Sequence, residues 1–333
     1  MENTPPLIQT KLHRPLLPVD LVPRPRLTEW LNERRRRPLT LVSAPAGYGK
    51  STLISCWLES VDCPTAWLSL DKHDNEFGGF LRYFLAAIRT NFPNAVPETQ
   101  ALLMATPLPP IAAIANNLIN ELDRIDHAYI LVLDDYHLIE TQTIHDLLNE
   151  VLLHPPRNLH LVLGTRMDPL LPLVTLRANS HVTEIRTQDL RFNAEETTLL
   201  LQKMIGDPVD RDAVSEIDAQ AEGWVTGLRL AALAMRHRIG RDDLQGELSV
   251  HNRYVTEYLL SEILAKQAAS LSDCMLKTSI LYRFCADLCE YICFQADEPS
   301  CNGSAQADFN GLLFTQWLQA SNLFVTPLDD QHE

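Results

Sequence analysis

A glycine-rich segment containing a lysine and a hydroxyl residue has the most specific chemistry in this sequence. Residues 43–53 read SAPAGYGKSTL, with Ala44 at the first position of the pattern. A strict phosphate-binding loop instead has glycine there, followed by four residues and then Gly-Lys-Ser or Gly-Lys-Thr. Alanine adds one methyl group, which an ordinary extended or helical backbone tolerates at the loop entrance. The segment therefore predicts a nucleotide site.

The chemistry of such a loop requires inward-pointing backbone amides, a helix N-terminus behind them and a lysine that reaches the terminal phosphates. Gly47 and Gly49 would supply the tight backbone, Lys50 the positive charge and Ser51 a hydroxyl ligand for Mg²⁺. We expect ATP or ADP to contact seven consecutive residues, namely Ala46, Gly47, Tyr48, Gly49, Lys50, Ser51 and Thr52.

Two adjacent acidic residues end a second apolar run, AYILVLDD, as Asp134 and Asp135. In nucleotide-hydrolysing proteins the carboxylate at this place holds magnesium through water, and its neighbour orients or activates the attacking water. A polar turn is the alternative interpretation of two acids after a strand. The phosphate loop in the same chain favours the catalytic interpretation, in which Asp134 is a metal ligand alongside Ser51.

An arginine ends a third apolar run, LHLVLGTR, at Arg166. Ligands of open α/β sheets lie at the carboxyl ends of the strands. An arginine there can sense the terminal phosphate through charge-assisted hydrogen bonds. A surface salt bridge is the alternative role for this residue.

These groups need a scaffold that brings strand ends together, and the pattern along the chain predicts one. Helical stretches at 78–92 and 110–125 lie between strand-like runs. Strands that alternate with helices imply parallel pairing, with helices on both faces of an open sheet. We therefore expect an α/β P-loop domain over 1–190 whose strands are at 38–44, 65–71, 128–135, 158–166 and 181–186.

The pattern becomes helical after about residue 190. Asn193, followed three residues later by Glu196, has the spacing of a capping box. We expect an all-α helical domain over 191–268. A partial winged-helix domain would cover 269–333, with a polar loop at 295–309, a last helix at 309–321 and the first arm of a hairpin at 322–330.

Composition limits the function classes. The 333 residues carry 28 Lys and Arg against 43 Asp and Glu, a net charge of −15, which disfavours nucleic-acid binding by bulk electrostatics. No apolar run is long enough to span a membrane, and the N-terminus lacks the apolar core of a signal peptide. The seven cysteines form no C-x-x-C pair, as expected of a reducing compartment. We therefore predict a cytoplasmic protein without membrane contact.

Two further clusters have ordinary structural interpretations. The run from Arg34 to Arg37 predicts a solvated helix end just before a strand. Cys285, Cys289 and Cys293 would lie on one face of a helix because they are four residues apart. A metal site usually has tighter spacing and a closing ligand, so core packing is the favoured role.

Several segments together resemble a known family. In order they are KLHRP, LVPRPRL, SAPAGYGKSTL, WLSLDKHDN, LVLDDYHLI, LVLGTR, LRFNAEE and GWVTGLRLAAL. They are similar to the large ATP-binding LuxR-type regulators that resemble the maltose-regulon activator. Those regulators are signal-transduction NTPases with numerous domains, the STAND class. The resemblance covers essentially the whole chain.

The resemblance implies roles for individual residues. Lys50 and Ser51 would contact phosphates and magnesium, Asp134 and Asp135 would complete the magnesium and water site, and Arg166 would be the sensor. It also implies that Arg24 and Arg26, in LVPRPRL, lie in the segment that covers the nucleotide base. GWVTGLRL would pack near the base, although Val225 stands where many members have proline.

The resemblance also implies a function. It predicts a switch that binds ATP or ADP with Mg²⁺, self-associates in the ATP state with an unknown small-molecule or protein inducer, and resets by slow hydrolysis. Members carry a C-terminal helix-turn-helix that these residues lack, so we expect no DNA contact here. Two alternatives remain, namely a P-loop kinase or transferase and a module that binds nucleotide without hydrolysis.

Overall fold

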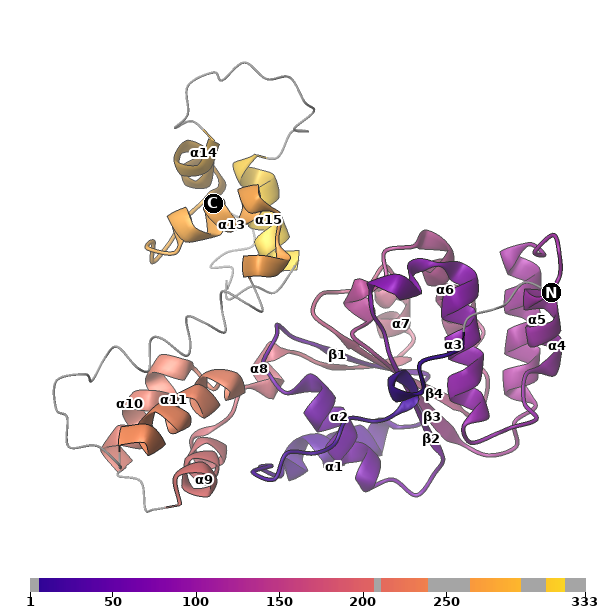
Figure 1. The fold of residues 1–333 in the computed structure, drawn as a ribbon, viewed down its shortest axis with the longest axis horizontal. Coiled ribbons are helices and arrows are strands. Elements are labelled where there is room, and N and C mark those ends of the chain that lie inside the picture. Colours follow the sequence, from indigo (N-terminus) through magenta and orange to yellow (C-terminus); the bar gives the residue numbers. More distant parts are fainter. Residues whose placement is uncertain (1–5, 207–210, 239–263, 295–309, 321–333) are drawn as a thin grey trace.

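The chain folds around a five-stranded parallel sheet in a computed structural model that describes residues 6–206, 211–238, 264–294 and 310–320. The strand order is β2-β3-β4-β1-β5, and every neighbouring pair is parallel (Figure 1). The five predicted strands are all present, as β1 (Leu39–Ser43), β2 (Thr65–Ser69), β3 (Tyr129–Asp134), β4 (Leu159–Thr165) and β5 (Val182–Ile185).

Both faces of the sheet are buried because apolar residues occupy both sides of each central strand. In β3, Leu131 and Leu133 face one core, whereas Ile130 and Val132 face the other. The first core is covered by α3 (Phe77–Arg89), α5 (Ile111–Asp123), α6 (Gln142–Leu153) and α7 (Leu173–Ala178). The second is covered by α1 (Pro25–Arg34), α2 (Lys50–Glu59) and α8 (Thr187–Leu190). This arrangement confirms the predicted α/β class.

The strand order determines how the chemical groups meet. Strand β4 pairs with β1 on one side and with β3 on the other. The residue after β4, Arg166, therefore leaves the sheet between the glycine-rich loop that follows β1 and the acidic pair at the end of β3. The sequence predicts the strands but not this order, which depends on long-range pairing.

A group of helices follows the sheet (Figure 1). It comprises α9 (Ala194–Ile205), α10 (Arg211–Ala221) and α11 (Val225–Arg238). The predicted capping box is confirmed, because Asn193 accepts a hydrogen bond from the Glu196 amide and Glu196 accepts one from the Asn193 amide. The remaining elements are α4 (Pro97–Leu103) and the short helices η1 (Gln9–Leu12), η2 (Lys72–Asn75) and η3 (Tyr136–Leu138).

The C-terminal part contains η5 (Leu264–Lys266), α13 (Ala269–Thr278), α14 (Ala286–Phe294) and α15 (Gly311–Ala320). The last of these confirms the helix predicted at 309–321. Residues 239–263 of the predicted helical domain, the polar loop at 295–309 and the hairpin arm at 322–330 lie outside the described residues. No helix in the described ranges is long and apolar enough to cross a membrane.

The two clusters singled out in the sequence have structural roles. Helix α1 ends at Arg34, and the rest of the arginine run leads to β1. Cys289 is fully buried and packs with Cys274 and Cys293 in the core between α13 and α15. This packing confirms the expected core role for Cys289 and Cys293. The described residues contain no group of three or more His, Cys, Asp or Glu side chains that could hold a metal ion.

His160 is a buried imidazole in the second core. Its Nδ1 lies 2.6 Å from the carbonyl oxygen of Arg37 and its Nε2 lies 3.0 Å from the hydroxyl of Thr40. Since a carbonyl oxygen can only accept, Nδ1 carries the proton and Nε2 accepts from the hydroxyl. Burial lowers the pKa of His160 to about 4, although the bond to the Arg37 carbonyl acts in the opposite direction.

We predict that His160 makes the fold acid-sensitive. Its folded pKa of about 4 lies below the ordinary 6.5, so the stability it contributes is present above pH 6.5 and is lost as pH falls toward 4. The loss approaches about 3 kcal/mol. Urea unfolding should show a smaller decrease in the free energy of unfolding between pH 7.5 and 4.5 for His160→Gln than for wild type. His154→Gln, at an exposed position, is the control, and equal decreases in all three proteins would contradict the prediction.

Candidate functional site

The glycine-rich loop connects β1 to α2 and takes a backbone shape that requires two of its glycines. Gly47 has φ of 81° and Gly49 has φ of 78°, a left-handed region that other residues rarely adopt. Gly49 is also the residue that precedes α2, and its carbonyl accepts the helix's first bond from Leu53 at 2.8 Å. The loop is thus followed directly by a helix N-terminus, as phosphate binding requires.

Lys50 is buried at the first position of α2. Its ammonium group donates to the carbonyl oxygens of Ala44 at 2.8 Å and Pro45 at 3.0 Å. Burial lowers the pKa of Lys50 to about 8, and the charge of Arg166 lowers it further, while Asp135 and Asp134 act in the opposite direction. The ammonium group therefore binds carbonyl oxygens of its own loop rather than a carboxylate.

Asp134 is a buried carboxylate at the end of β3. Burial raises its pKa to about 6, and the charge of Asp135 adds to this increase, while interaction with the Ser51 hydroxyl lowers it. Its Oδ1 atom has no hydrogen-bond partner among the described residues. A Cβ atom on Gly164 of β4 would lie 2.3 Å from this oxygen, so only glycine at 164 leaves room for it.

These features fit a Mg²⁺ ion with nucleotide. Magnesium prefers oxygen ligands and usually takes one or two from the protein, with phosphate and water oxygens completing the shell. Asp134 supplies a carboxylate oxygen without a hydrogen-bond partner in the described structure, and the Ser51 hydroxyl lies close enough to affect its pKa. The residues present therefore match the donor set that this ion needs.

Asp135 and Arg166 line the same cavity as the loop. Asp135 has φ of 57°, an uncommon value for a residue other than glycine, and its half-exposed side chain lies 3.8 Å from His137. Arg166 is near enough to lower the pKa of Lys50. The structure thus brings together the acidic pair, the arginine and the lysine that the sequence predicted for one site.

The cavity has a volume of about 490 Å³, in the range of small-ligand sites. One wall is the loop from Ala46 to Thr52, which includes every residue predicted there. A second wall comes from the N-terminal segment, with Asp20 and Leu21, and a third from the helical region, with Leu200 and Val225. Three separate parts of the chain therefore enclose one space.

The helical region also bonds directly to the loop. Trp224 donates from Nε1 to the Ala46 carbonyl at 3.1 Å. Thr226 donates to the Gly47 carbonyl twice, from its backbone amide at 3.1 Å and from its hydroxyl at 3.0 Å. A Cβ atom on Gly47 would lie 2.6 Å from the side chains of both residues. The first turn of α11 therefore packs against the backbone of the phosphate loop.

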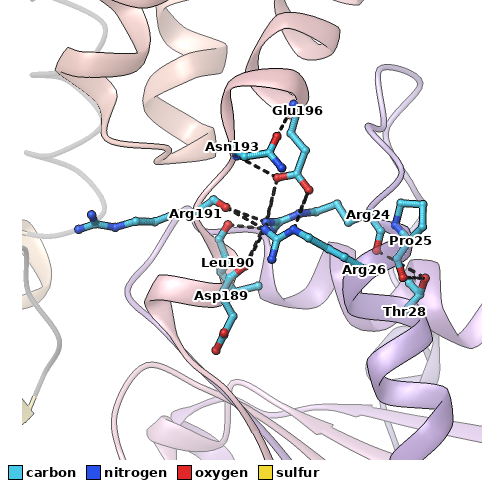
Figure 2. A network of polar contacts seen from close by, with 9 residues as sticks. All are labelled: Arg24, Pro25, Arg26, Thr28, Asp189, Leu190, Arg191, Asn193 and Glu196. Carbon is cyan, nitrogen blue, oxygen red and sulfur yellow. Dashed lines mark hydrogen bonds and ion pairs between the residues drawn. The ribbon is translucent and has the colours of Figure 1, made fainter.

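Arg24 and Arg26 are held by the start of the helical region (Figure 2). Arg24 is buried and bonds Glu196 through two nitrogens at 3.1 Å each, and it also donates to the Leu190 carbonyl at 2.8 Å. Arg26 bonds Glu196 at 3.2 Å and the Asp189 carbonyl at 2.9 Å. Arg24 lines the cavity, whereas Arg26 is outside the set of lining residues.

Some of these partners carry no recognisable signal in the sequence. The sequence indicates only a capping role for Glu196. Burial raises the pKa of its carboxyl group, but hydrogen bonds from Arg24 and Arg26 outweigh burial, so the pKa is lowered overall. Asp71 and Asp74 form ion pairs with Lys11 at 3.0 Å and 2.5 Å. A second ion pair, between Asp20 and Arg229 at 2.8 Å, joins the N-terminal segment to α11. All of these contacts link residues far apart in the chain.

The fold and the loop have the architecture of a P-loop NTPase domain, and solved structures of ATPases are similar to this chain. One is a signal-transduction ATPase with numerous domains and a tetratricopeptide repeat sensor from Pyrococcus horikoshii, with a TM-score of 0.52 and 15% identity over 96% of this chain and 41% of that one. Another is a Walker-type ATPase of Pyrococcus abyssi, with a TM-score of 0.60 and 14% identity over 95% of this chain and 94% of that one. At these identities the likeness shows the fold alone.

Sequence relatives are more specific. Residues 260–333 match the MalT winged helix domain. The HTH-type transcriptional regulator MalT of Yersinia pestis is 30% identical over 98% of this chain and 35% of that protein. MalT of Klebsiella pneumoniae is 29% identical over the same shares. The chain is similar to MalT over nearly its full length, which confirms the predicted resemblance, and it spans about a third of the length of these relatives.

Proposed function

We propose that this chain is the nucleotide-dependent switch of a MalT-like transcriptional regulator. In the proposal ADP holds the nucleotide-binding, helical and winged-helix parts closed. ATP with an inducer opens them for self-association, and slow hydrolysis restores the resting state. The proposed parts are 1–190, 191–268 and 269–333, and the winged-helix family match begins slightly earlier, at residue 260.

The observation that carries the proposal is the contact between α11 and the phosphate loop. Trp224 and Thr226 donate hydrogen bonds to the carbonyls of Ala46 and Gly47. The amides of this loop are the groups that would bind phosphate, so a ligand that changes the loop also changes what α11 contacts. Ordering of segments by phosphate and magnesium contacts is an established physical basis for switching.

The proposed roles of the site residues follow from their positions. Ser51 and Asp134 would hold Mg²⁺, which supplies positive charge against the phosphate oxygens. Lys50 would leave the carbonyls of its own loop to reach the terminal phosphates. Asp135 would orient the attacking water, and Arg166 would contact the phosphate that distinguishes ATP from ADP.

The base-covering role of Arg24 and Arg26 takes a specific form. Their guanidinium groups bind Glu196 and carbonyl oxygens of residues 189–191. We propose that they act by fixing the segment before α1 against the helical region. Residues just before them, including Asp20 and Leu21, line the cavity and would cover the base. The expected absence of DNA contact stays a prediction, since a winged helix domain is present.

We predict that Lys50→Ala weakens binding of both ATP and ADP at least tenfold, because the loop loses its only cation. The affinities should be measured by isothermal titration calorimetry with Mg²⁺ present. Lys72→Ala, which removes an exposed lysine from η2, is the matched control and should leave both affinities within twofold. An affinity for ATP and ADP unchanged by Lys50→Ala would refute the nucleotide site.

We predict that Asp135→Asn reduces slow phosphate release from ATP while leaving ATP affinity within a few-fold. The amide keeps the shape of the side chain but removes the charge that would orient or activate water. Single-turnover phosphate release and equilibrium binding measure the two effects separately. Equal release rates in wild type and variant would instead support a module that binds nucleotide without hydrolysis.

A further inference from the structure

A second cavity lies at the amino-terminal ends of the strands, whereas the nucleotide site lies at their carboxyl-terminal ends. It has a volume of about 580 Å³. Its walls come from the end of α1 and from the segments that enter β1, β4 and β5, including Arg37, Arg157 and His181. These are the amino-terminal ends of three adjacent strands, whereas the phosphate loop and Asp135 follow carboxyl-terminal ends. The two cavities are therefore separate sites.

The lining of this cavity is strongly basic in an acidic protein. Four arginines and one glutamate line it, although the whole chain has a net charge of −15. The charged residues are Glu33, Arg34, Arg36, Arg37 and Arg157. Like charges gathered in one concave space repel each other and raise the local concentration of anions. The sequence suggests only a solvated charge run here, because Arg157 and His181 join it through the fold.

The arginines have donors left after their protein contacts are counted. Arg37 uses one nitrogen to bond the Val182 carbonyl at 2.7 Å. Arg34 pairs with Glu33 at 2.9 Å, and Arg157 pairs with Asp123 at 2.9 Å. Arg36 is exposed and makes no hydrogen bond or ion pair with another described residue. A guanidinium group has five N–H donors, so each of these side chains can still bind a ligand.

We propose that this cavity binds a small anion that carries two or more phosphate groups. Guanidinium groups bind phosphate oxygens in a planar, two-pronged geometry. Three arginines of one run line this cavity together with Arg157 from a second segment. The volume suits a small ligand. Because the cavity touches the strand ends of β4 and β1, which carry Arg166 and the phosphate loop at their other ends, occupancy would act on the scaffold that positions the nucleotide.

The test uses inorganic pyrophosphate as the probe and calorimetry as the readout. The whole chain carrying Lys50→Ala serves as the background, so that binding at the phosphate loop is suppressed. Arg36→Gln in this background should weaken pyrophosphate binding at least tenfold, and Arg157→Gln, on another wall, should weaken it as well. Thermal melts check that each variant is folded.

Arg35→Gln is the matched control. Arg35 is the neighbouring arginine, is also exposed, and pairs with Asp62 at 2.9 Å outside the cavity. The substitution removes the same charge and should change pyrophosphate affinity less than twofold. Equal effects of Arg35→Gln and Arg36→Gln would show diffuse attraction and overturn the proposal. So would the absence of pyrophosphate binding, or binding of a single-stranded oligonucleotide or an acidic peptide in place of pyrophosphate.

Discussion

The site depends on the burial of two opposite charges that have few hydrogen-bond partners. Lys50 and Asp134 are both buried, and burial shifts the pKa of the lysine down to about 8 and that of the aspartate up to about 6. Each shift corresponds to a penalty on the charged form on the order of 3 kcal/mol. Such groups are costly without a partner, and a magnesium nucleotide is the ligand whose charges match both. The fold therefore positions both charged groups before a ligand binds, and their burial favours a ligand of complementary charge.

The surrounding residues keep this arrangement in place. Gly164 leaves room for the Asp134 carboxylate, and the positive φ of Gly47 and Gly49 shapes the loop around Lys50. A ligand that binds the folded site preferentially stabilises whatever conformation holds the site together. In this chain that conformation includes the helical region, because Thr226 bonds the loop and Glu196 bonds Arg24. In the proposed switch, these contacts would link the nucleotide state to the arrangement of the domains.

Much of the fold and of the site could be predicted from the sequence. The five strands and the capping box at Asn193 follow from local periodicity and cap chemistry, which depend on neighbouring residues. The carboxyl ends of parallel strands lie along one side of the sheet. The sequence therefore predicts that the loop lies close to Asp134, Asp135 and Arg166. The strand order, the Arg24 contact with Glu196 and the Lys11 contacts with Asp71 and Asp74 could not be predicted. These contacts join residues that local patterns do not relate, so only the folded chain shows them.

Hydrogen exchange at the start of α11 measures the coupling between the phosphate loop and the helical region. We expect Mg-ADP to slow exchange of the Thr226 amide, which donates to the Gly47 carbonyl, at least tenfold relative to the chain without nucleotide. A non-hydrolysable ATP analogue should slow it less, and Lys50→Ala should abolish the difference between the two nucleotides. Identical exchange of this amide in the ligand-free, ADP-bound and ATP-analogue-bound chain, with nucleotide binding confirmed, would contradict the coupling of the loop to the helical region.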